Sequence, residues 1–254
     1  MAWERYEGET VTGDVRILRG ELDRELFAYL PPSHGLPGRR FPVVYMHDGQ
    51  NLFDEATSNT GEWRVDETME ALAPEGLEAI VVGIPHAGER RGHEYAGDGA
   101  RTYLGFVVEQ VRPLVEDAFA VEPGRGSTGV AGSSLGALSS LLALYVHPDV
   151  FGFAGLLSPA FWWNGDDRWN ELVESEPRPA ARIYMDVGDD EGEGDGRLRR
   201  AYVDGYERMA ALLRAKGYGD DELRTVLEPG AVHLESAWAR RLPDALRFLL
   251  PRPR

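Results

Sequence analysis

A serine stands between two glycines near the middle of the chain, in the stretch Gly132-Ser133-Ser134-Leu135-Gly136. This stretch matches the pattern G-x-S-x-G, which lifts a serine hydroxyl above a sheet on a sharp turn from a strand into a helix. The apolar residues before and after the stretch favour that strand and that helix. Glycines are needed two positions away on each side because strand and helix crowd together there. We therefore predict that Ser134 is a nucleophile and that Ser133 is an inert neighbour.

A serine hydroxyl becomes a strong nucleophile only when a base removes its proton, and two histidines follow Ser134. His147 ends the helix predicted to begin at Ser134, and about a dozen residues at 1.5 Å each carry it away from the turn. His233 lies in the loop 228–233, between the last predicted strand and the last predicted helix. In this arrangement the chain order is serine, acid, histidine. We predict that His233 is the base.

The acid that orients the base is expected in the loop after the preceding strand. That loop, 188–196, is rich in carboxylates, and position alone does not choose between Asp189, Asp190 and Glu191. Most of these side chains are expected to be solvated. The spacing does not follow the EF-hand pattern, so a calcium loop is disfavoured.

An oxyanion hole needs two backbone N–H groups. The first is expected from Leu135, the residue after the nucleophile. The second is expected from the loop 47–54, where Gly49 would let the backbone turn so that the N–H of Gln50 points into the site. His47, at the start of this loop, is expected to be a packed residue at a strand end.

The segments that position these residues alternate between short apolar runs and helical patterns. The apolar runs, typical of buried parallel strands, span 41–46, 79–84, 127–131, 153–157, 182–187 and 223–227. The helical patterns span 65–73, 103–119, 135–145, 198–216 and 236–250. Two earlier segments, 10–18 and 25–30, resemble antiparallel strands. The pattern predicts a single α/β domain over residues 1–254, with a mostly parallel sheet and helices on both faces.

Composition excludes several classes of function. The chain has no cysteine, which excludes a cysteine nucleophile, disulfides and thiolate metal sites. A formal net charge of −16 disfavours nucleic acid and anionic membranes as partners. No apolar run is long enough for a membrane span, and no apolar segment follows the N-terminus, so we expect a cytoplasmic protein. We expect no metal and no cofactor, because His86 and His93 lack the spacing of paired ligands on a helix.

Bulky aromatic residues close to the predicted loops are candidates for the wall of a substrate pocket. They are Trp63, Trp162 and Trp163, and ordinary core packing is an equally good interpretation of each.

Taken together, these loops resemble the putative-esterase family of α/β hydrolases, which includes esterase D-like enzymes, enterochelin esterases, feruloyl esterase domains and mycolyltransferases. The stretches that carry the resemblance are 44–54, 132–137, 157–163, 186–191 and 233–238. The resemblance implies the α/β-hydrolase fold. It also implies Glu191 as the acid, through the pattern Gly-x-x-acid, and supports His233 and Gln50. Arg90 to Asp98 departs from the family by lacking a proline after Glu94-Tyr95, so a relative's substrate preference is not carried over.

The leading hypothesis is a serine carboxylic-ester hydrolase acting on a small-molecule ester through an acyl-enzyme. One alternative, implied by the mycolyltransferase relatives, passes the acyl group to a sugar or another alcohol. A second alternative is a catalytically silent binding scaffold, which the presence of all three expected triad residues disfavours.

Overall fold

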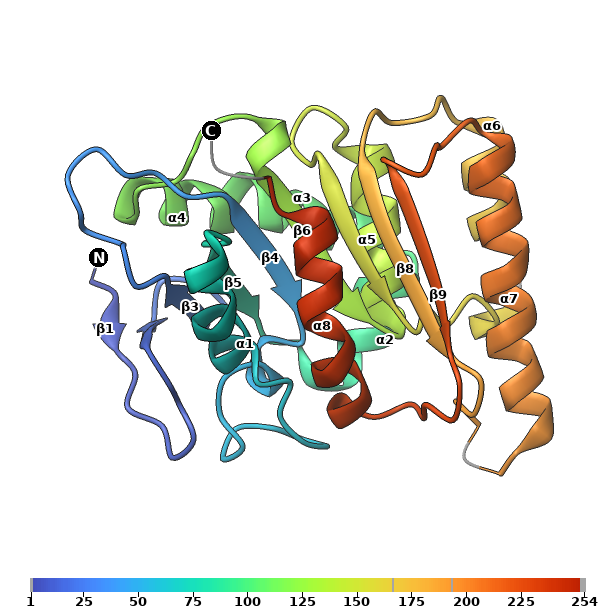
Figure 1. The fold of residues 1–254 in the computed structure, drawn as a ribbon, viewed down its shortest axis with the longest axis horizontal. Helices are drawn as coiled ribbons and strands as arrows, with labels where there is room; N and C mark the ends of the chain where they lie inside the picture. The colour runs from blue at the N-terminus through green and yellow to red at the C-terminus, as the bar shows by residue number, and fades with distance from the viewer. Residues whose placement is uncertain (1, 166, 193, 252–254) are drawn as a thin grey trace.

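The computed structural model describes residues 2–165, 167–192 and 194–251. In these residues one nine-stranded sheet has the order β1-β2-β3-β5-β4-β6-β7-β8-β9 (Figure 1). Its strands are β1 (Glu4–Arg5), β2 (Asp14–Leu18), β3 (Leu26–Leu30), β4 (Val43–His47), β5 (Ile80–Ile84), β6 (Thr128–Ser133), β7 (Phe153–Leu157), β8 (Arg182–Gly188) and β9 (Leu223–Glu228).

The six expected buried strands are β4 to β9, and every pairing among them is parallel. The first three strands pair antiparallel with one another, and β3 pairs antiparallel with β5. Strand β4 lies between β5 and β6, so the loop after β4 lies beside the turn after β6. This neighbourhood brings the expected oxyanion loop next to the expected nucleophile, and the prediction of an α/β-hydrolase fold is confirmed.

Eight α-helices are present in the described residues, together with shorter helical turns. The helices are α1 (Val65–Leu72), α2 (Arg91–Ala96), α3 (Ala100–Phe106), α4 (Arg112–Ala118), α5 (Leu135–Val146), α6 (Arg168–Ser175), α7 (Gly196–Ala215) and α8 (Glu235–Leu249). The turns are η1 (Gly49–Asn51), η2 (Ala73–Glu75), η3 (Gly88–Arg90), η4 (Val107–Val111), η5 (Arg125–Ser127) and η6 (Trp163–Gly165).

The helices cover both faces of the sheet, and each face has its own apolar core. Helices α1 and α8 cross one face, where Met69 and Leu246 pack with Met46 of β4 (Figure 1). Helices α5 and α7 are among those on the opposite face, where Leu141 and Met209 belong to the second core. Side chains alternate along each strand, so both faces of the central strands are buried.

The predicted helix 103–119 is interrupted in the structure. Helix α3 passes into α4 through the π-helical turn η4, and Pro113 lies in the first turn of α4. A proline has no N–H and its ring clashes with the carbonyl four residues earlier, and a widened turn is one way to relieve that clash. The sequence pattern marked the extent of this helical stretch but not its wider turn.

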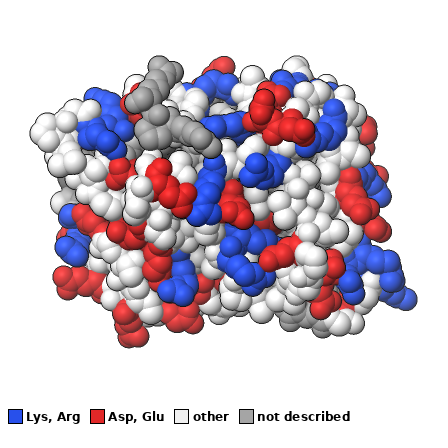
Figure 2. All heavy atoms as spheres, in the orientation of Figure 1, with Lys and Arg blue, Asp and Glu red and all other residues white. Residues whose placement is uncertain are grey.

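Acidic and basic side chains are interspersed on the face seen in Figure 2. The net charge of −16 is therefore not separated into one large acidic region on that face. None of the described helices is long and apolar enough to cross a membrane.

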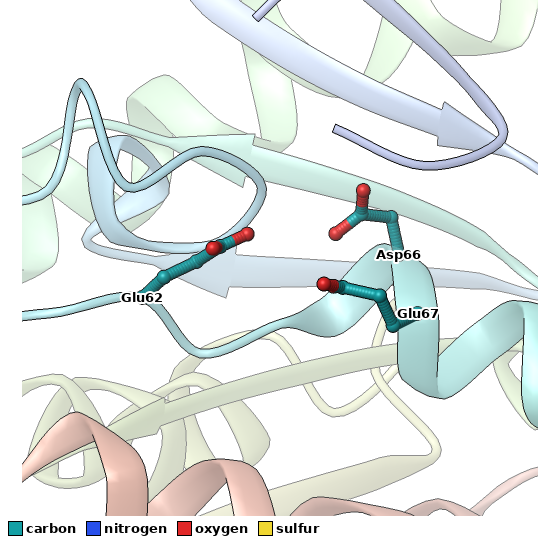
Figure 3. Close-up of side chains that lie close together, drawn as sticks. All are labelled: Glu62, Asp66 and Glu67. Atoms are coloured by element: carbon teal, nitrogen blue, oxygen red, sulfur yellow. The ribbon is translucent and has the colours of Figure 1, made fainter. Parts of the chain in front are cut away.

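The N-terminal segment is attached to α1 through Asp66. The carboxylate of Asp66 accepts hydrogen bonds from the Thr12 backbone N–H at 2.6 Å and from its hydroxyl at 3.2 Å. Its other oxygen faces the carboxylates of Glu62 and Glu67, and the three acids point toward one another in Figure 3. Burial, reinforced by Glu67, raises the pKa of Asp66 to about 8, although the bond from Thr12 opposes this rise.

Asp66→Asn is expected to make stability less dependent on pH. A carboxyl whose pKa is raised on folding stabilises the native state below its unfolded pKa of about 4 and loses that contribution as pH rises toward about 8. The free energy of unfolding, measured in urea from pH 5 to pH 8.5, should therefore fall less steeply in the variant. Asp244→Asn, a change on exposed surface of α8, is the control and should follow the wild type. Parallel curves for Asp66→Asn and the wild type would contradict the assignment.

Candidate active site

Ser134 lies on a strained turn between β6 and α5. Its φ of 54° and ψ of −118° are unusual for a residue with a side chain, and α5 begins at the next residue. The Ser134 N–H donates to the carbonyl of Leu157 at 3.0 Å, which ties the turn to the end of β7. Strain of this kind is what the G-x-S-x-G pattern requires to expose a serine hydroxyl.

The two flanking glycines are required by space. A Cβ on Gly132 would lie 2.9 Å from the carbonyl carbon of Gly136. A Cβ on Gly136 would lie 3.1 Å from Cβ of His47, the last residue of β4. The expected crowding of strand and helix is therefore present on both sides of Ser134.

His233 is held by Glu191. The His233 Nδ1 and the Glu191 Oε2 are 2.6 Å apart, and the Glu191 side chain has no exposed surface. The second carboxylate oxygen, Oε1, accepts bonds from the Gly188 N–H at 2.6 Å and the Ser158 hydroxyl at 2.5 Å. Burial alone would raise the pKa of Glu191, but the bonds from His233, Ser158 and Gly188 outweigh it and lower that pKa. Glu191 is therefore an ionised acceptor for the imidazole.

Asp189 and Asp190, the other two candidates for the acid, are directed elsewhere. The Asp189 carboxylate accepts from the Gly230 N–H at 2.6 Å, and Asp190 is bound through its backbone N–H to the Ala231 carbonyl at 3.0 Å. A further acid of the same loop, Asp195, caps the N-terminus of α7. The structure thus places only Glu191, of the three candidates, beside His233.

The residues that hold Glu191 were missed by the sequence analysis. Ser158 follows β7 with a φ of 45° and is fully buried. Its oxygen accepts bonds from Trp238 Nε1 at 2.9 Å and Arg241 Nη2 at 2.8 Å, while its hydroxyl donates to Glu191. Each donor comes from α8, so the last helix fixes the position of the acid. Ser158 lay in a stretch that carried the family resemblance, but nothing in its spacing indicated this contact.

Arg241 lies among three carboxylates. Its guanidinium is 3.3 Å from Asp186, 3.4 Å from Glu228 and 3.8 Å from Glu191, and its side chain is 4% exposed. Burial raises the pKa of Asp186 to about 7, and the nearby positive charge of Arg241 limits the rise. Protonation of Asp186 below about pH 7 removes one negative charge from this group.

The expected oxyanion donors lie at the starts of two helical turns. Leu135 is the first residue of α5 and Gln50 is the second residue of η1, so neither N–H has an acceptor within its own helix. The reason given for Gly49 needs correction, because the left-handed residue is Asp48, with a φ of 56°. Gly49 is required because a Cβ there would lie 2.4 Å from the backbone of Gly83.

Asp48 is fixed in that conformation by its neighbours. Arg91 donates two bonds to its carboxylate, at 2.7 and 2.8 Å, and its backbone N–H donates to the Tyr95 hydroxyl at 3.1 Å. His47 is buried and bound to the Tyr103 hydroxyl at 2.8 Å, and burial lowers its pKa to about 4. His47 is thus a neutral packed residue, as expected from its place at the strand end.

A cavity of about 270 Å³ opens beside Ser134 and His233. Most of its lining residues have polar side chains, and several of them were not selected by the sequence analysis. The lining residues are Asp48, Gln50, Asn51, Asn59, Thr60, His86, Arg91, Ser133, Ser134, His233, Leu234, Glu235 and Trp238. The acidic member Glu235 is already bound, because it accepts from Thr60 at 2.6 Å and from Asn51 at 3.2 Å.

The three tryptophans predicted as pocket walls do not line this cavity in the described residues. Trp63 is 2% exposed and packs against Trp238 in the core, with ring centroids 5.4 Å apart. Trp162 and Trp163 are half-buried next to each other, and Trp162 meets the ring of Tyr202 edge-on at 5.5 Å. Trp63 therefore supports the wall from behind.

The described residues bring together one set of side chains with the spacing of metal ligands. These are the carboxylates of Glu62, Asp66 and Glu67, which lie within 4.8 Å of one another and take no part in lining the cavity (Figure 3). Arg64 neutralises part of this charge through a 3.0 Å ion pair with Glu67. His86 is bound instead to Asn59 and to the Gly88 N–H.

A family model described as "Putative esterase" matches residues 20–249. The chain belongs to the Putative esterase family. The reaction class of this esterase is therefore hydrolysis of a carboxylic ester, which confirms the resemblance based on sequence motifs.

Relatives of this esterase cover most of the chain. The uncharacterized protein YbbA of Bacillus subtilis is 29% identical over 242 residues, spanning 89% of this chain and 92% of its own. The ferri-bacillibactin esterase BesA of the same organism is 24% identical, spanning 80% and 79%.

Solved structures of low sequence identity share the fold of this esterase. The ferric enterobactin esterase of Salmonella typhimurium has a TM-score of 0.75 at 18% identity, covering 95% of this chain and 59% of its own. The BES protein of Bacillus cereus has a TM-score of 0.69 at 19% identity, covering 97% and 98%.

Glu191→Gln is expected to lower kcat by about 10³- to 10⁴-fold with little change in folding, as replacement of a triad acid by its amide does elsewhere. The amide can donate to Nδ1 and so favour the tautomer in which Nε2 carries the proton. The measurement is kcat and KM on p-nitrophenyl acetate, with the melting temperature as the check on folding. Asp190→Asn, one position away, is the matched control and should retain activity. Equal losses of kcat in the two variants would contradict the role of Glu191 as the acid.

Proposed function

We propose that this protein hydrolyses a small, polar carboxylic ester through an acyl-enzyme formed on Ser134, with His233 as the base and Glu191 as the acid. The 2.6 Å bond between His233 Nδ1 and Glu191 carries the proposal. Because the ionised Glu191 accepts a hydrogen bond from Nδ1–H, Nε2 of the neutral imidazole is a hydrogen-bond acceptor. Ser134 and His233 line the same cavity, which supports their working on one substrate.

The reaction would proceed in two stages. Ser134 Oγ attacks the ester carbonyl as its proton moves to His233 Nε2, and the N–H groups of Gln50 and Leu135 bind the oxygen that becomes negative. Collapse of this intermediate expels the alkoxide, which takes the proton from His233. Water then attacks the acyl-enzyme by the same steps and regenerates Ser134.

The cavity supports a substrate with a small polar part. A volume of about 270 Å³ lies just below the roughly 300 to 1,000 Å³ typical of pockets for drug-sized ligands, so the bound part of the substrate is expected to be small. Its lining is formed by amides, hydroxyls, histidines and charged groups, with Leu234 and Trp238 as the apolar exceptions. A long acyl chain would leave these polar groups without partners, which is costly. The relatives that are siderophore esterases support ester hydrolysis as the reaction class but not a particular substrate.

Ser134→Ala should abolish turnover, with a loss of roughly 10⁴-fold or more in kcat. A hydroxyl is removed and no other group replaces the nucleophile. The measurement compares p-nitrophenyl acetate hydrolysis by the two proteins at equal concentration, with product analysis in the presence of a competing alcohol. Ser133→Ala is the matched control and should remain active. A folded Ser134→Ala protein with near-normal turnover would contradict the mechanism.

Acyl length should affect the specificity constant sharply. We expect kcat/KM on p-nitrophenyl esters to fall at least about tenfold between the butyrate and the octanoate, because the cavity is small and only Leu234 and Trp238 offer apolar side chains to a longer chain. Ser134→Ala provides the background at each length. A rate that rises steadily to the octanoate would contradict a small polar pocket while leaving the nucleophile unaffected.

A further inference from the structure

Tyr202 places a hydroxyl directly beside the base. This residue lies in the second turn of α7, is 3% exposed, and has its hydroxyl 3.3 Å from His233 Nε2. The two rings are also in contact, with centroids 4.8 Å apart at an angle of 37°. Nε2 is the atom that must receive the serine proton in the proposed function, on which this inference rests. The Tyr202 hydroxyl at Nε2 can therefore affect this proton transfer.

Ser134 also acts on the pKa of the same hydroxyl. Burial raises the pKa of Tyr202 to about 12, and the neighbouring Ser134 and Trp162 side chains oppose that rise. The phenol is therefore neutral at any ordinary pH and keeps its proton. The Tyr202 ring contacts two neighbours, Trp162 edge-on at 5.5 Å and His233 at 4.8 Å between ring centroids.

The direction of each bond follows from counting protons. His233 Nδ1 carries the imidazole proton because Glu191 is an ionised acceptor at 2.6 Å, so Nε2 of the neutral ring can only accept. Tyr202 must then donate its O–H to Nε2, which leaves the lone pairs of its oxygen for the hydroxyl proton of Ser134. The result is a chain of donors that runs from Ser134 through Tyr202 and His233 to Glu191.

We propose that Tyr202 is a catalytic residue whose hydroxyl bridges Ser134 Oγ and His233 Nε2 and orients both reacting atoms before attack. Nε2 has one lone pair, and the Tyr202 hydroxyl occupies it, so the proton that Nε2 receives during attack comes from Tyr202 while the Ser134 proton passes to the Tyr202 oxygen. Tyr202 is neutral before and after this transfer. Contacts of this kind are often long in a free enzyme and shorten with substrate bound, which fits the 3.3 Å separation. No bond to carbon is made or broken by Tyr202.

The chain offers a matched control one helical turn further on. Tyr206 lies on the same face of α7 and is 7% exposed, and its pKa is influenced by Thr225 rather than by Ser134. Tyr202→Phe and Tyr206→Phe remove the same atom from the same helix, and only the first removes a contact with His233. The two variants therefore separate the bridging role from packing of α7.

The experiment measures the rate at which a fluorophosphonate labels Ser134, together with kcat and KM on p-nitrophenyl acetate and the melting temperature. Tyr202→Phe should label ten- to a hundred-fold more slowly, with kcat reduced to match and KM within about threefold, since misplaced reacting groups cost rate rather than binding. Tyr206→Phe should label like the wild type. Labelling of Tyr202→Phe within twofold of the wild type would overturn the proposal. Failure of the wild type itself to label would instead overturn the proposed function.

A second measurement keeps the proposal testable if Tyr202→Phe folds poorly. A fluorinated tyrosine introduced at position 202 keeps the ring and hydroxyl but ionises at lower pH. A phenolate cannot donate to Nε2, so labelling should then decline on the alkaline side, where the wild type, with a pKa of about 12, does not. The same substitution at position 206 should leave the pH profile unchanged. An unchanged profile at position 202 would overturn the bridging role.

Discussion

A buried carboxylate stays ionised only if hydrogen-bond donors surround it. The candidate site depends on this condition at Glu191. Burial disfavours its charge, and bonds from Gly188, Ser158 and His233 restore it. These donors come from the end of β8, the turn after β7 and the loop before α8. Removing the charge would release the imidazole, so one side chain links the end of β8, the turn after β7 and the loop that carries His233.

The strained backbone of the site is likewise held by hydrogen bonds from its surroundings. Three left-handed residues with side chains, Asp48, Ser134 and Ser158, each follow or end the central strands β4, β6 and β7. Isolated strain of this kind costs of order 1 to 3 kcal/mol for each residue, so the surroundings must enforce it. Asp48 is held by Arg91, Ser134 by the Leu157 carbonyl, and Ser158 by the Asp186 carbonyl at 3.0 Å. The three turns are adjacent because the strands are adjacent in the sheet.

The parts of this structure that the sequence predicted are those encoded locally. Apolar runs and helical periodicity identified the parallel strands and the fold, and G-x-S-x-G identified the turn at Ser134, since neighbouring residues produce it. The acid was different, because three carboxylates occupied one loop and only the family resemblance favoured Glu191. Which of the three carboxylates reaches His233 depends on tertiary packing, which the sequence of the loop does not reveal.

Contacts between distant segments left no local pattern to find. Ser158 meets Trp238 and Arg241 across about eighty positions, and Tyr202 meets His233 across thirty-one. Trp63 was equally consistent with a pocket wall or with the core, and only its packing on Trp238 decided between them. The role of Gly49 was misread for the same reason, because the atoms that exclude a Cβ there belong to β5.

The buried charges explain how one arginine can serve a site with several acids. Arg241 contacts Asp186, Glu228 and Glu191, and a single guanidinium cannot neutralise three ionised carboxylates in a buried group. Protonation of Asp186, whose pKa is raised to about 7, relieves that excess, whereas Glu191 has its own donors and keeps its charge. As pH rises through about 7, ionisation of Asp186 places a second negative charge beside Glu191 and opposes folding. The stability of the folded site thus depends on one proton, on Asp186, that lies outside the Glu191–His233 pair.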